Sequence, residues 1–479
     1  MTELLTPDIC VIGAGPGGLS VAAAAAAVGV SAVLIEKAGM GGEGLRQSGP
    51  LPAQALLAAA AHAHALRNST QFGFKAARIT ADLAAINAYA QDVIAAVAPN
   101  FARERFVGLG VRVVNGTARF VDADTVAVGD FAVKARRFVI ATGSSPLIPP
   151  IPGLLHTPHL TDESVFRLAE CPRHLVVIGA GARCLELAQA FRRLGAEVTV
   201  LTTAAPLPGE DRECAAVVLD AIEREGVKLR CGVEITKVSR ALAKIHIVLE
   251  TPGGVETVEG SRLLVVAGRR PNIEDLDLDA AGIRYRPEGI VVDGRLMTTN
   301  KRVYAVGDVT GGPHFTHLAH YHANVVICRE LFRLRSGVNG RPVPRVTYTD
   351  PELAHVGLSE EEAQAKKRTI RVLRWPYREN DRAQAQRATN GHIKVITDGK
   401  GDILGATIVG VHAAENITAW TLAVSQRLNI RAFAGLIVPY PTFAEVGKRA
   451  AITYFSLGLT PSRARRIIDR LMRWRRRGG

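Results

Sequence analysis

The sequence predicts a multidomain α/β protein whose first two domains are built on parallel sheets. Length is the first observation: 479 residues, 47% of them apolar, exceed what one hydrophobic core usually organises and suffice for two or three cores. The second is a repeated pattern in which an apolar strand runs into a glycine-rich turn and then a helix. It begins near Asp8 and again near Leu175, so two Rossmann-like domains are expected.

The first copy of the pattern reads DICVIGAGPGGLSVAAAAAAVGVSAVLIEK. Gly13, Gly15 and Gly18 are expected to form the tight turn, the close approach to a pyrophosphate and the contact between helix and strand. Glu36 ends the second strand, where a carboxylate accepts hydrogen bonds from ribose hydroxyls. The alanine-rich residues 19–35 indicate a buried helix running into a strand rather than a membrane span.

The second copy reads HLVVIGAGARCLELAQAFRRLGAEVTVLTT and departs from the pattern at two places. Gly179 and Gly181 are present, but Cys184 replaces the third glycine, which weakens the site without abolishing it. The second strand ends in Thr202 and Thr203 rather than in an acid, and no arginine follows immediately. Neither NADH nor NADPH is therefore preferred, and a nucleotide fold that has lost its ligand remains an alternative.

Three more motifs follow in order: ATGSSPLIPPIPG (141–153), VAGRRPN (266–272) and VYAVGDVTGG (303–312). With the two glycine turns, the chain resembles the class I pyridine nucleotide-disulfide oxidoreductases, flavoproteins such as dihydrolipoamide dehydrogenase, glutathione reductase and mercuric reductase. The resemblance implies an FAD domain, an NAD(P) domain and a C-terminal α+β interface domain that forms a homodimer. The expected boundaries are 1–149 and 272–342 for the FAD domain, 150–271 for the NAD(P) domain, 343–459 for the interface domain and 460–479 for a basic tail.

The same resemblance implies further contacts with FAD. Thr142 and Gly143 of the ATG segment and Gly307 of AVGD would lie at the cofactor, and Asp308 would hydrogen-bond its ribityl chain. His317 matches a histidine that relatives often carry. It is one of four histidines in PHFTHLAHYHAN, for which polar contacts near the cofactor or the dimer interface are expected rather than a metal site, because no cluster of carboxylates or cysteines accompanies them.

The stretch GGEGLRQSGPLPAQALL (41–57) stands where relatives keep two redox-active cysteines. Here Gly44 holds the first cysteine position, Pro50 holds the second, and Gln54 replaces a lysine. Five residues rather than four separate Gly44 from Pro50, which suggests a reshaped loop. Because neither glycine nor proline can attack sulfur, a relay from flavin to a dithiol is excluded.

Three residues are the catalytic candidates. In relatives the lysine at Gln54 pairs with a glutamate matched by Glu186. Without that lysine, Glu186 is expected either to favour its protonated form, if it is buried, or to find another partner. Tyr440 stands where most relatives have histidine, and Glu445 keeps the glutamate that follows it; both would come from the partner subunit. The ordinary pKa of tyrosine, near 10, does not suit proton exchange with a thiol at neutral pH.

The function that these features predict is an FAD-dependent NAD(P)H oxidoreductase that passes electrons from reduced flavin directly to a quinone-like or other small non-disulfide acceptor. Mercury reduction is disfavoured, because mercuric reductases with tyrosine at this position bind metal through C-terminal cysteines, whereas this chain ends in arginines and glycines. The alternative is a flavin-bound pseudoenzyme that acts as a binding or regulatory partner.

Charge gathers at the C-terminus. The net charge is +14, and Arg463 to Arg477 contains eight arginines against one aspartate. On a helical wheel the apolar residues of this tail group on one side, which suits an anionic membrane surface or an acidic partner, or packing on the protein's own body. Nucleic acid is disfavoured because no recognition module accompanies the tail. The N-terminus does not resemble a signal peptide, so a cytoplasmic protein is expected, with peripheral binding to the membrane through the tail as the alternative.

Overall fold

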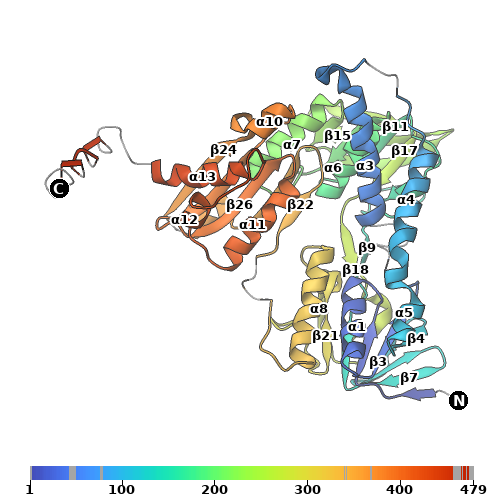
Figure 1. Cartoon of the computed structure of the whole chain (residues 1–479). Coiled ribbons are helices and arrows are strands. Elements are labelled where there is room, and N and C mark those ends of the chain that lie inside the picture. Colours follow the sequence, from blue (N-terminus) through green and yellow to red (C-terminus); the bar gives the residue numbers. More distant parts are fainter. Residues whose placement is uncertain are drawn as a thin grey trace. The chain divides into compact units, whose positions relative to one another are not determined.

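The structure, a computed structural model, describes residues 3–42, 50–75, 79–338, 340, 342–366, 369–456, 465–466, 468–470 and 472–473. The chain divides into two compact units (Figure 1). The first contains Met1–Pro206 and Glu225–Gly340, and the second contains Leu207–Arg224 and Arg341–Gly479. The three-domain boundaries expected from the sequence remain a prediction.

The first unit contains a five-stranded parallel sheet in the order β21-β8-β2-β3-β4. Its strands are β2 (Ile9–Ile12), β3 (Ala32–Glu36), β4 (Arg112–Asn115), β8 (Arg137–Ile140) and β21 (Val303–Ala305). β2 is buried along its whole length, as expected of a central parallel strand that is covered on both faces. Helix α1 (Pro16–Ala27) joins β2 to β3, which confirms the predicted helix that runs into a strand.

Four more helices and a small sheet belong to this half of the first unit. The helices are α3 (Pro50–Arg67), α4 (Leu83–Val97), α5 (Arg103–Gly108) and α8 (Thr316–Glu330). The small sheet, in the order β1-β7-β6-β5, consists of β1 (Glu3–Leu5), β5 (Arg119–Phe120), β6 (Thr125–Val128) and β7 (Phe131–Lys134). α8 packs on α1, and α3 packs on α4. The core between the two sheets includes the edge-to-face rings of Phe120 and Phe138, whose centroids lie 5.5 Å apart.

A second five-stranded parallel sheet, in the order β10-β17-β11-β12-β13, repeats the design of the first. Its strands are β10 (Leu160–Thr161), β11 (His174–Ile178), β12 (Glu197–Thr202), β13 (Lys228–Cys231) and β17 (Arg262–Val265). Helix α6 (Ala182–Arg193) follows β11 as α1 follows β2. An antiparallel sheet of β14 (Glu234–Ala241), β15 (Lys244–Thr251) and β16 (Gly254–Gly260) precedes β17. The two-fold occurrence of the α/β pattern is thus confirmed.

Two short antiparallel pairs complete the strands of the first unit. β9 (Ser144–Pro146) pairs with β18 (Arg269–Pro271), and β19 (Tyr285–Arg286) pairs with β20 (Gly289–Ile290). β9 follows β8 of the first parallel sheet, and β18 follows β17 of the second. The β9–β18 pair therefore holds together the two chain connections that run between the parallel sheets.

The second unit is built on an antiparallel sheet in the order β22-β23-β26-β25-β24. Its strands are β22 (Arg345–Thr347), β23 (Glu352–Gly357), β24 (Ile370–Pro376), β25 (His392–Asp398) and β26 (Ile403–Gly410). Its helices are α7 (Arg212–Arg224), α9 (Glu360–Ala365), α10 (Asp381–Ala385), α11 (Ala413–Ser425), α12 (Arg431–Ala434) and α13 (Glu445–Ser456). α11 packs on β23 and β26, and α13 packs on β24 and β25. Trp420 stacks on Phe433 in this core, with the ring centroids 3.9 Å apart.

The other face of this sheet carries a buried lysine that binds the segment containing α7. Side chains alternate along β25, so Ile393 lies in the apolar core while Lys394 points to the opposite face. Lys394 Nζ lies 2.7 Å from Asp211 Oδ2 and 2.7 Å from Glu360 Oε2. Burial disfavours the charged lysine, but the surrounding carboxylates outweigh it and raise its pKa. Sequence order places α7 among strands of the second parallel sheet, yet its contacts place it in this unit.

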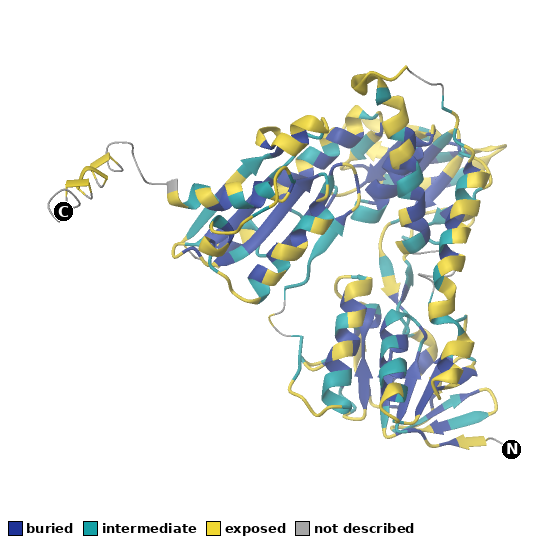
Figure 2. Cartoon of the chain, in the orientation of Figure 1, coloured by how far each residue is buried: buried dark blue, intermediate teal, exposed yellow. Residues whose placement is uncertain are grey.

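Buried residues concentrate on the strands of the parallel and antiparallel sheets (Figure 2). Within the described ranges, no helix is long and apolar enough to cross a membrane. Of the basic tail, residues 465–466, 468–470 and 472–473 are described, and they are helical and exposed. The other tail residues lie outside the described ranges.

Candidate functional site

The glycines of the first turn have two different roles, because two are required for packing and one leaves open space beside the helix. Gly13 has φ +103°, and a Cβ there would collide with the carbonyl oxygen of Ala141. A Cβ at Gly18 would collide with the carbonyl oxygen of Gly13, so helix and strand pack as closely as the motif predicts. A Cβ at Gly15 would meet only the Ala141 oxygen, at 3.9 Å. Packing therefore requires glycine at 13 and 18, whereas Gly15 leaves open space at the N-terminus of α1.

Glu36 lies against this turn at the end of β3. Its Oε2 accepts a hydrogen bond from the amide of Ala14 at 2.7 Å. Its Oε1 accepts from the amides of Ala38 at 2.6 Å and Gly39 at 3.1 Å. The backbone thus holds an acceptor carboxylate beside the glycine turn, which is the arrangement that recognises ribose hydroxyls in a dinucleotide fold.

The second turn has the same division of roles. A Cβ at Gly179 would collide with the carbonyl oxygen of Val266, whereas one at Gly181 would meet no atom within 4 Å. Cys184, at the position of the third glycine, is completely buried in the packed core. The Thr202 hydroxyl donates to the carbonyl of Ala204 at 3.0 Å and accepts from its amide at 3.2 Å. The replacement by cysteine is therefore accommodated, and space at Gly181 is kept.

Thr142 and Gly143 are held by the motif that follows β17. Thr142 Oγ1 donates to the carbonyl of Asn272 at 2.8 Å, and the Asn272 side-chain amide donates to the carbonyl of Thr142 at 2.9 Å. The amide of Asn272 donates to the carbonyl of Gly143, also at 2.9 Å. The motifs ATGSSP and GRRPN, which are far apart in the sequence, therefore form one structural element.

Gly307 and Asp308 lie in a short 3-10 helix, η5 (Gly307–Thr310). Asp308 Oδ2 accepts a hydrogen bond from Ser144 Oγ at 2.7 Å. The amide of Gly307 donates to His322 Nδ1 at 3.2 Å. Burial lowers the pKa of His322, while the Asp308 carboxylate opposes this shift. His322 is therefore the neutral tautomer that accepts through Nδ1.

The other histidines of this segment have separate surroundings. His317 is exposed near the start of α8 and stacks on Phe315, with ring centroids 5.0 Å apart. His320 Nδ1 lies 3.0 Å from Ser20 Oγ, which links α8 to α1. Among the residues that the structure describes, no group of three or more His, Cys, Asp or Glu side chains is arranged to hold a metal ion.

Glu186 is buried on α6 and has a cation beside it. Arg183 Nη1 donates to Glu186 Oε2 at 3.1 Å, and the Glu186 side chain is only 4% exposed. Gln54 is exposed near the start of α3. Glu186 thus follows the second of the two expectations and has found another partner. Gly44 and the loop proposed to be reshaped lie outside the described residues, which resume at Pro50.

Tyr440 and Glu445 belong to the second unit. The Tyr440 ring is 70% exposed, and its hydroxyl donates to Asp381 Oδ2 at 2.8 Å. This hydrogen bond raises the pKa of Tyr440, so the phenol stays protonated at neutral pH. Glu445, half-buried, is the first residue of α13.

The nucleotide turns fit the cofactors that the motifs suggest. At both Gly15 and Gly181 the helix begins without a side-chain cap, and a Cβ would enter open space that a pyrophosphate could occupy. The carboxylates of Glu36 and Asp308 are hydrogen-bond acceptors, which suits the hydroxyls of a ribose and a ribityl chain.

Comparison with known families identifies the chain. Residues 7–323 match the family model described as pyridine nucleotide-disulphide oxidoreductase, and residues 343–451 match the dimerisation domain of the same family. The chain belongs to this family. Members of the pyridine nucleotide-disulphide oxidoreductases bind FAD and NAD(P)H, and the dimerisation domain supports a homodimer.

Relatives within the family include two enzymes of different names. A mercuric reductase of Bacillus cereus is 34% identical over 456 residues, which are 93% of this chain and 71% of the relative. A dihydrolipoyl dehydrogenase of Thermus scotoductus is 35% identical over 447 residues, which are 92% of this chain and 95% of the relative.

Solved structures of the family have the same fold. LpdA from Mycobacterium tuberculosis superimposes with a TM-score of 0.85 at 26% identity, covering 94% of this chain and 99% of LpdA. The Cu(II) complex of the HOCl-induced flavoprotein disulfide reductase RclA from Escherichia coli gives a TM-score of 0.83 at 26% identity, covering 94% of this chain and all of RclA.

Several polar residues beside the cofactor motifs escape a sequence reading that follows the pyridine nucleotide-disulphide oxidoreductase pattern. Arg183 pairs with Glu186 at a spacing of three on one helix, a signal that the sequence does contain. Ser144 and Asp308 are 164 residues apart, and Arg269, which also binds Ser144, is 125 residues from it. No local pattern indicates these last two contacts.

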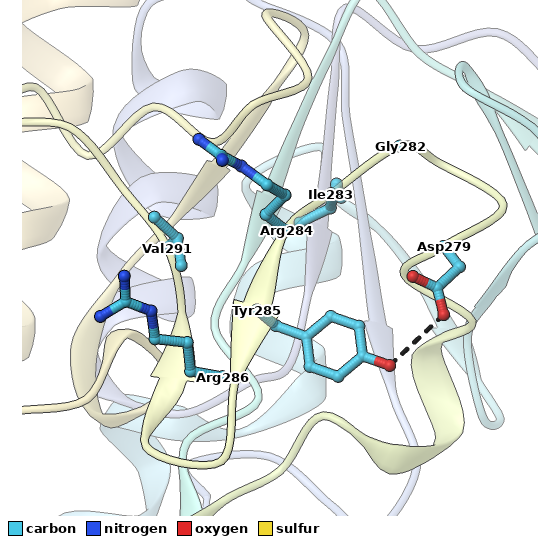
Figure 3. A pocket seen from close by; sticks show the side chains of 7 residues that line it. All are labelled: Asp279, Gly282, Ile283, Arg284, Tyr285, Arg286 and Val291. Atoms are coloured by element: carbon cyan, nitrogen blue, oxygen red, sulfur yellow. Dashed lines mark hydrogen bonds between the residues drawn. The ribbon is translucent and has the colours of Figure 1, made fainter.

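A hollow of about 500 Å³ lies elsewhere in the first unit, at the β19–β20 hairpin (Figure 3). Tyr285 turns toward Asp279, and its hydroxyl donates a hydrogen bond to Asp279 Oδ2 at 3.3 Å (Figure 3). The Arg284 and Arg286 side chains extend on the other side of the strand (Figure 3). None of the residues that line it is a predicted cofactor or catalytic residue.

Proposed function

We propose that this chain is an FAD-dependent NAD(P)H oxidoreductase that delivers electrons to a small non-disulfide acceptor, such as a quinone-like molecule. The observation that carries the proposal is the absence of cysteine from residues 11–170, with Gly44 and Pro50 at the positions of the family's redox pair. Neither residue has a thiol, so neither can form a disulfide or attack one.

Three of the six cysteines are buried and cannot replace the missing pair. All six cysteines lie in the described residues, and none of them forms a disulfide there. Burial raises the pKa of Cys10 and of Cys214, and it raises the pKa of Cys184 to about 12. Because the thiolate is the reactive form, these buried thiols are inert at neutral pH.

The residues proposed to hold the cofactors are those of the glycine turns and their neighbours. Gly15, Glu36 and Asp308 would bind FAD, with Thr142 and Gly143 forming the adjoining backbone, and Gly181 would admit the pyrophosphate of NAD(P)H. When bound, FAD supplies the capacity to accept a hydride and to donate electrons to a second molecule. The turns of this chain orient the two nucleotides and bring backbone amides to their phosphates.

Tyr440 is proposed to help bind the acceptor from the partner subunit, together with Glu445. Its exposed ring can stack on a planar molecule, and its hydroxyl would donate a hydrogen bond to the acceptor in place of the one it donates to Asp381. Simple packing of Tyr440 in the dimer interface is the competing explanation.

An anaerobic titration with NADH and then with NADPH, followed by flavin absorbance, tests the proposal. One of the two is expected to bleach the flavin after a single two-electron equivalent, since a flavin without a partner disulfide holds two electrons. Pretreatment with iodoacetamide should leave this reduction, and the turnover with menadione, unchanged. Uptake of two equivalents, or loss of turnover on alkylation, would contradict the proposal.

The same titration separates this enzyme from a flavin-bound pseudoenzyme, which family membership does not favour. A flavin that dithionite reduces but neither nicotinamide nucleotide does would contradict the proposed oxidoreductase and support a binding role.

The arginine-rich tail is proposed to bring the enzyme to an anionic surface, either a membrane or an acidic partner. Ile468 and Met472, four residues apart, are exposed in the described part of the tail, where Arg470 and Arg473 also lie. Full-length protein should co-sediment with anionic vesicles more than a variant without the last sixteen residues, and salt should weaken the difference. Equal sedimentation of the two proteins with anionic vesicles would exclude binding of the tail to a membrane.

A further inference from the structure

Arg269, the first residue of β18, concentrates four hydrogen bonds at the junction between the two parallel sheets. Its Nε donates to Ser144 Oγ at 2.9 Å, and its Nη2 donates to the carbonyl oxygen of the same residue at 2.8 Å. Asp162 accepts from Nη1 at 3.0 Å, and Glu163 accepts from Nη2 at 2.6 Å. Its side chain is 23% exposed, so the guanidinium is largely shielded from solvent.

The contact with Ser144 continues to Asp308. Ser144 is buried on β9, and its hydroxyl both accepts from Arg269 and donates to Asp308 Oδ2 at 2.7 Å. A guanidinium can only donate, so the hydroxyl proton of Ser144 must point to Asp308. The direction of both hydrogen bonds is therefore fixed, from Arg269 to Ser144 and from Ser144 to Asp308. The positive charge of Arg269 polarises the Ser144 O–H group that donates to the carboxylate.

The two acids beside Arg269 hold the guanidinium in place. The side chains of Asp162 and Glu163 are 15% and 20% exposed. Burial raises the pKa of Asp162, and the charge of Arg269 opposes that shift. Arg269 is thus anchored on one side by two carboxylates and on the other by the backbone and hydroxyl of Ser144, which leaves it one orientation.

We propose that Arg269 is a positioning residue for the flavin site: acting through Ser144, it holds the Asp308 carboxylate in the orientation in which that carboxylate binds the ribityl chain of FAD. The proposal rests on the FAD site of the proposed function. It is independent of the electron acceptor. The neighbouring arginine has no such role, because Arg270 is exposed and pairs with Glu274.

The test measures the affinity for FAD of the apoprotein, by quenching of flavin fluorescence on reconstitution. Arg269→Gln and Ser144→Ala are each expected to weaken FAD binding by about 10- to 100-fold, the usual effect of a lost hydrogen bond to a charged group. Arg270→Gln is the matched control on the same strand and should bind FAD as the wild type does.

The double variant decides between positioning and a merely structural effect. If Arg269 acts through Ser144, the variant with both substitutions should bind FAD no more weakly than the worse single variant. Multiplied effects of the two substitutions, or wild-type affinity in Arg269→Gln, would overturn the proposal. Should Arg269→Gln fail to fold by circular dichroism, Ser144→Ala decides alone: wild-type affinity in that variant overturns the proposal.

Failure of the proposed function gives a different result. A wild-type protein that binds no FAD would overturn the flavin site itself. Wild-type binding that is retained in every variant would overturn only the role of Arg269.

Discussion

Arg183 donates a hydrogen bond to Glu186 at 3.1 Å within the first turns of α6. The family resemblance implies that the cation for this glutamate comes from a lysine at the position that Gln54 occupies here, on α3. In this chain the buried carboxylate keeps a positive partner, but the partner comes from its own helix, three residues earlier.

Removal of Arg183 should destabilise the first unit. Arg183→Met leaves Glu186 buried without this cation, and we expect a loss of about 1–3 kcal/mol in the free energy of unfolding. Arg224→Met, which breaks the exposed pair with Asp220, is the control and should cost little stability.

If Glu186 acts at the flavin, pH titrations of flavin absorbance must differ between wild type and Glu186→Gln. Identical titration curves would show that Glu186 has no role at the flavin.

Substitutions at Gly15 and Gly181, where a Cβ would face open space, should each weaken the binding of a different cofactor. Gly15→Ala is expected to fold, because its methyl group meets only one atom at 3.9 Å, but to bind FAD at least about tenfold more weakly. Gly181→Ala should retain FAD and raise the KM for NAD(P)H. Gly13→Ala, which collides with the backbone of Ala141, should instead yield little folded protein. Circular dichroism and flavin content distinguish these outcomes, and full FAD retention in Gly15→Ala would contradict the assigned site.

The buried lysine of the second unit should be sensitive to substitution. Lys394→Met removes the buried cation that Asp211 and Glu360 share, with an expected cost of about 3–5 kcal/mol in urea unfolding. Lys244→Met, at an exposed pair with Glu259, should leave stability unchanged. Equal stability of the two variants would mean that the Lys394 cluster contributes nothing to the fold.

His322 should make flavin binding sensitive to mild acid. Burial lowers the folded-state pKa of His322 below its ordinary value of 6.5. Its contribution to stability is therefore complete above pH 6.5 and is lost as the pH falls through the folded-state pKa. Thermal unfolding temperature and FAD retention should both decline as the pH drops from 7 toward 5. In His322→Asn, whose side-chain oxygen can still accept from Gly307, the decline should be shallower, whereas His62→Asn, at an exposed position of α3, should follow the wild type. Parallel pH curves for all three proteins would show that His322 does not cause this decline.

Tyr440→Phe tests whether the phenol serves the acceptor. The variant should be reduced by NAD(P)H as fast as wild type but show about a five- to tenfold lower kcat/KM for menadione, because one hydrogen bond to the acceptor is lost. Tyr285→Phe removes a similar exposed hydroxyl bound to Asp279 and is the matched control. Unchanged menadione kinetics in Tyr440→Phe would leave Tyr440 as a packing residue.

Sequence patterns predict the parts of the fold that repeat locally. The strand, glycine turn and helix of both parallel sheets are short-range features, and so is the close contact between Gly18 and Gly13. The Arg183–Glu186 pair is equally local and was within reach of the same reasoning.

Contacts between distant segments lie beyond such patterns. Tyr440 binds Asp381 across 59 residues, and Ser144 binds Asp308 across 164. The residue types at these positions are compatible with many partners, and only the folded sheets bring the chosen ones together. For the same reason the sequence order of α7 suggests one sheet, while its packing joins it to another.

The bond between Asp211 and Lys394 joins positions 183 residues apart, with α7 starting directly after the aspartate. Ribosomes add about 5–20 residues per second, so roughly 10–40 s pass between the synthesis of the two partners. During this interval the segment with Asp211 and α7 has been synthesised, but β25, which carries Lys394, has not. The second unit is therefore assembled late in translation, and a nascent chain stalled before residue 394 would present this helix to chaperones and proteases.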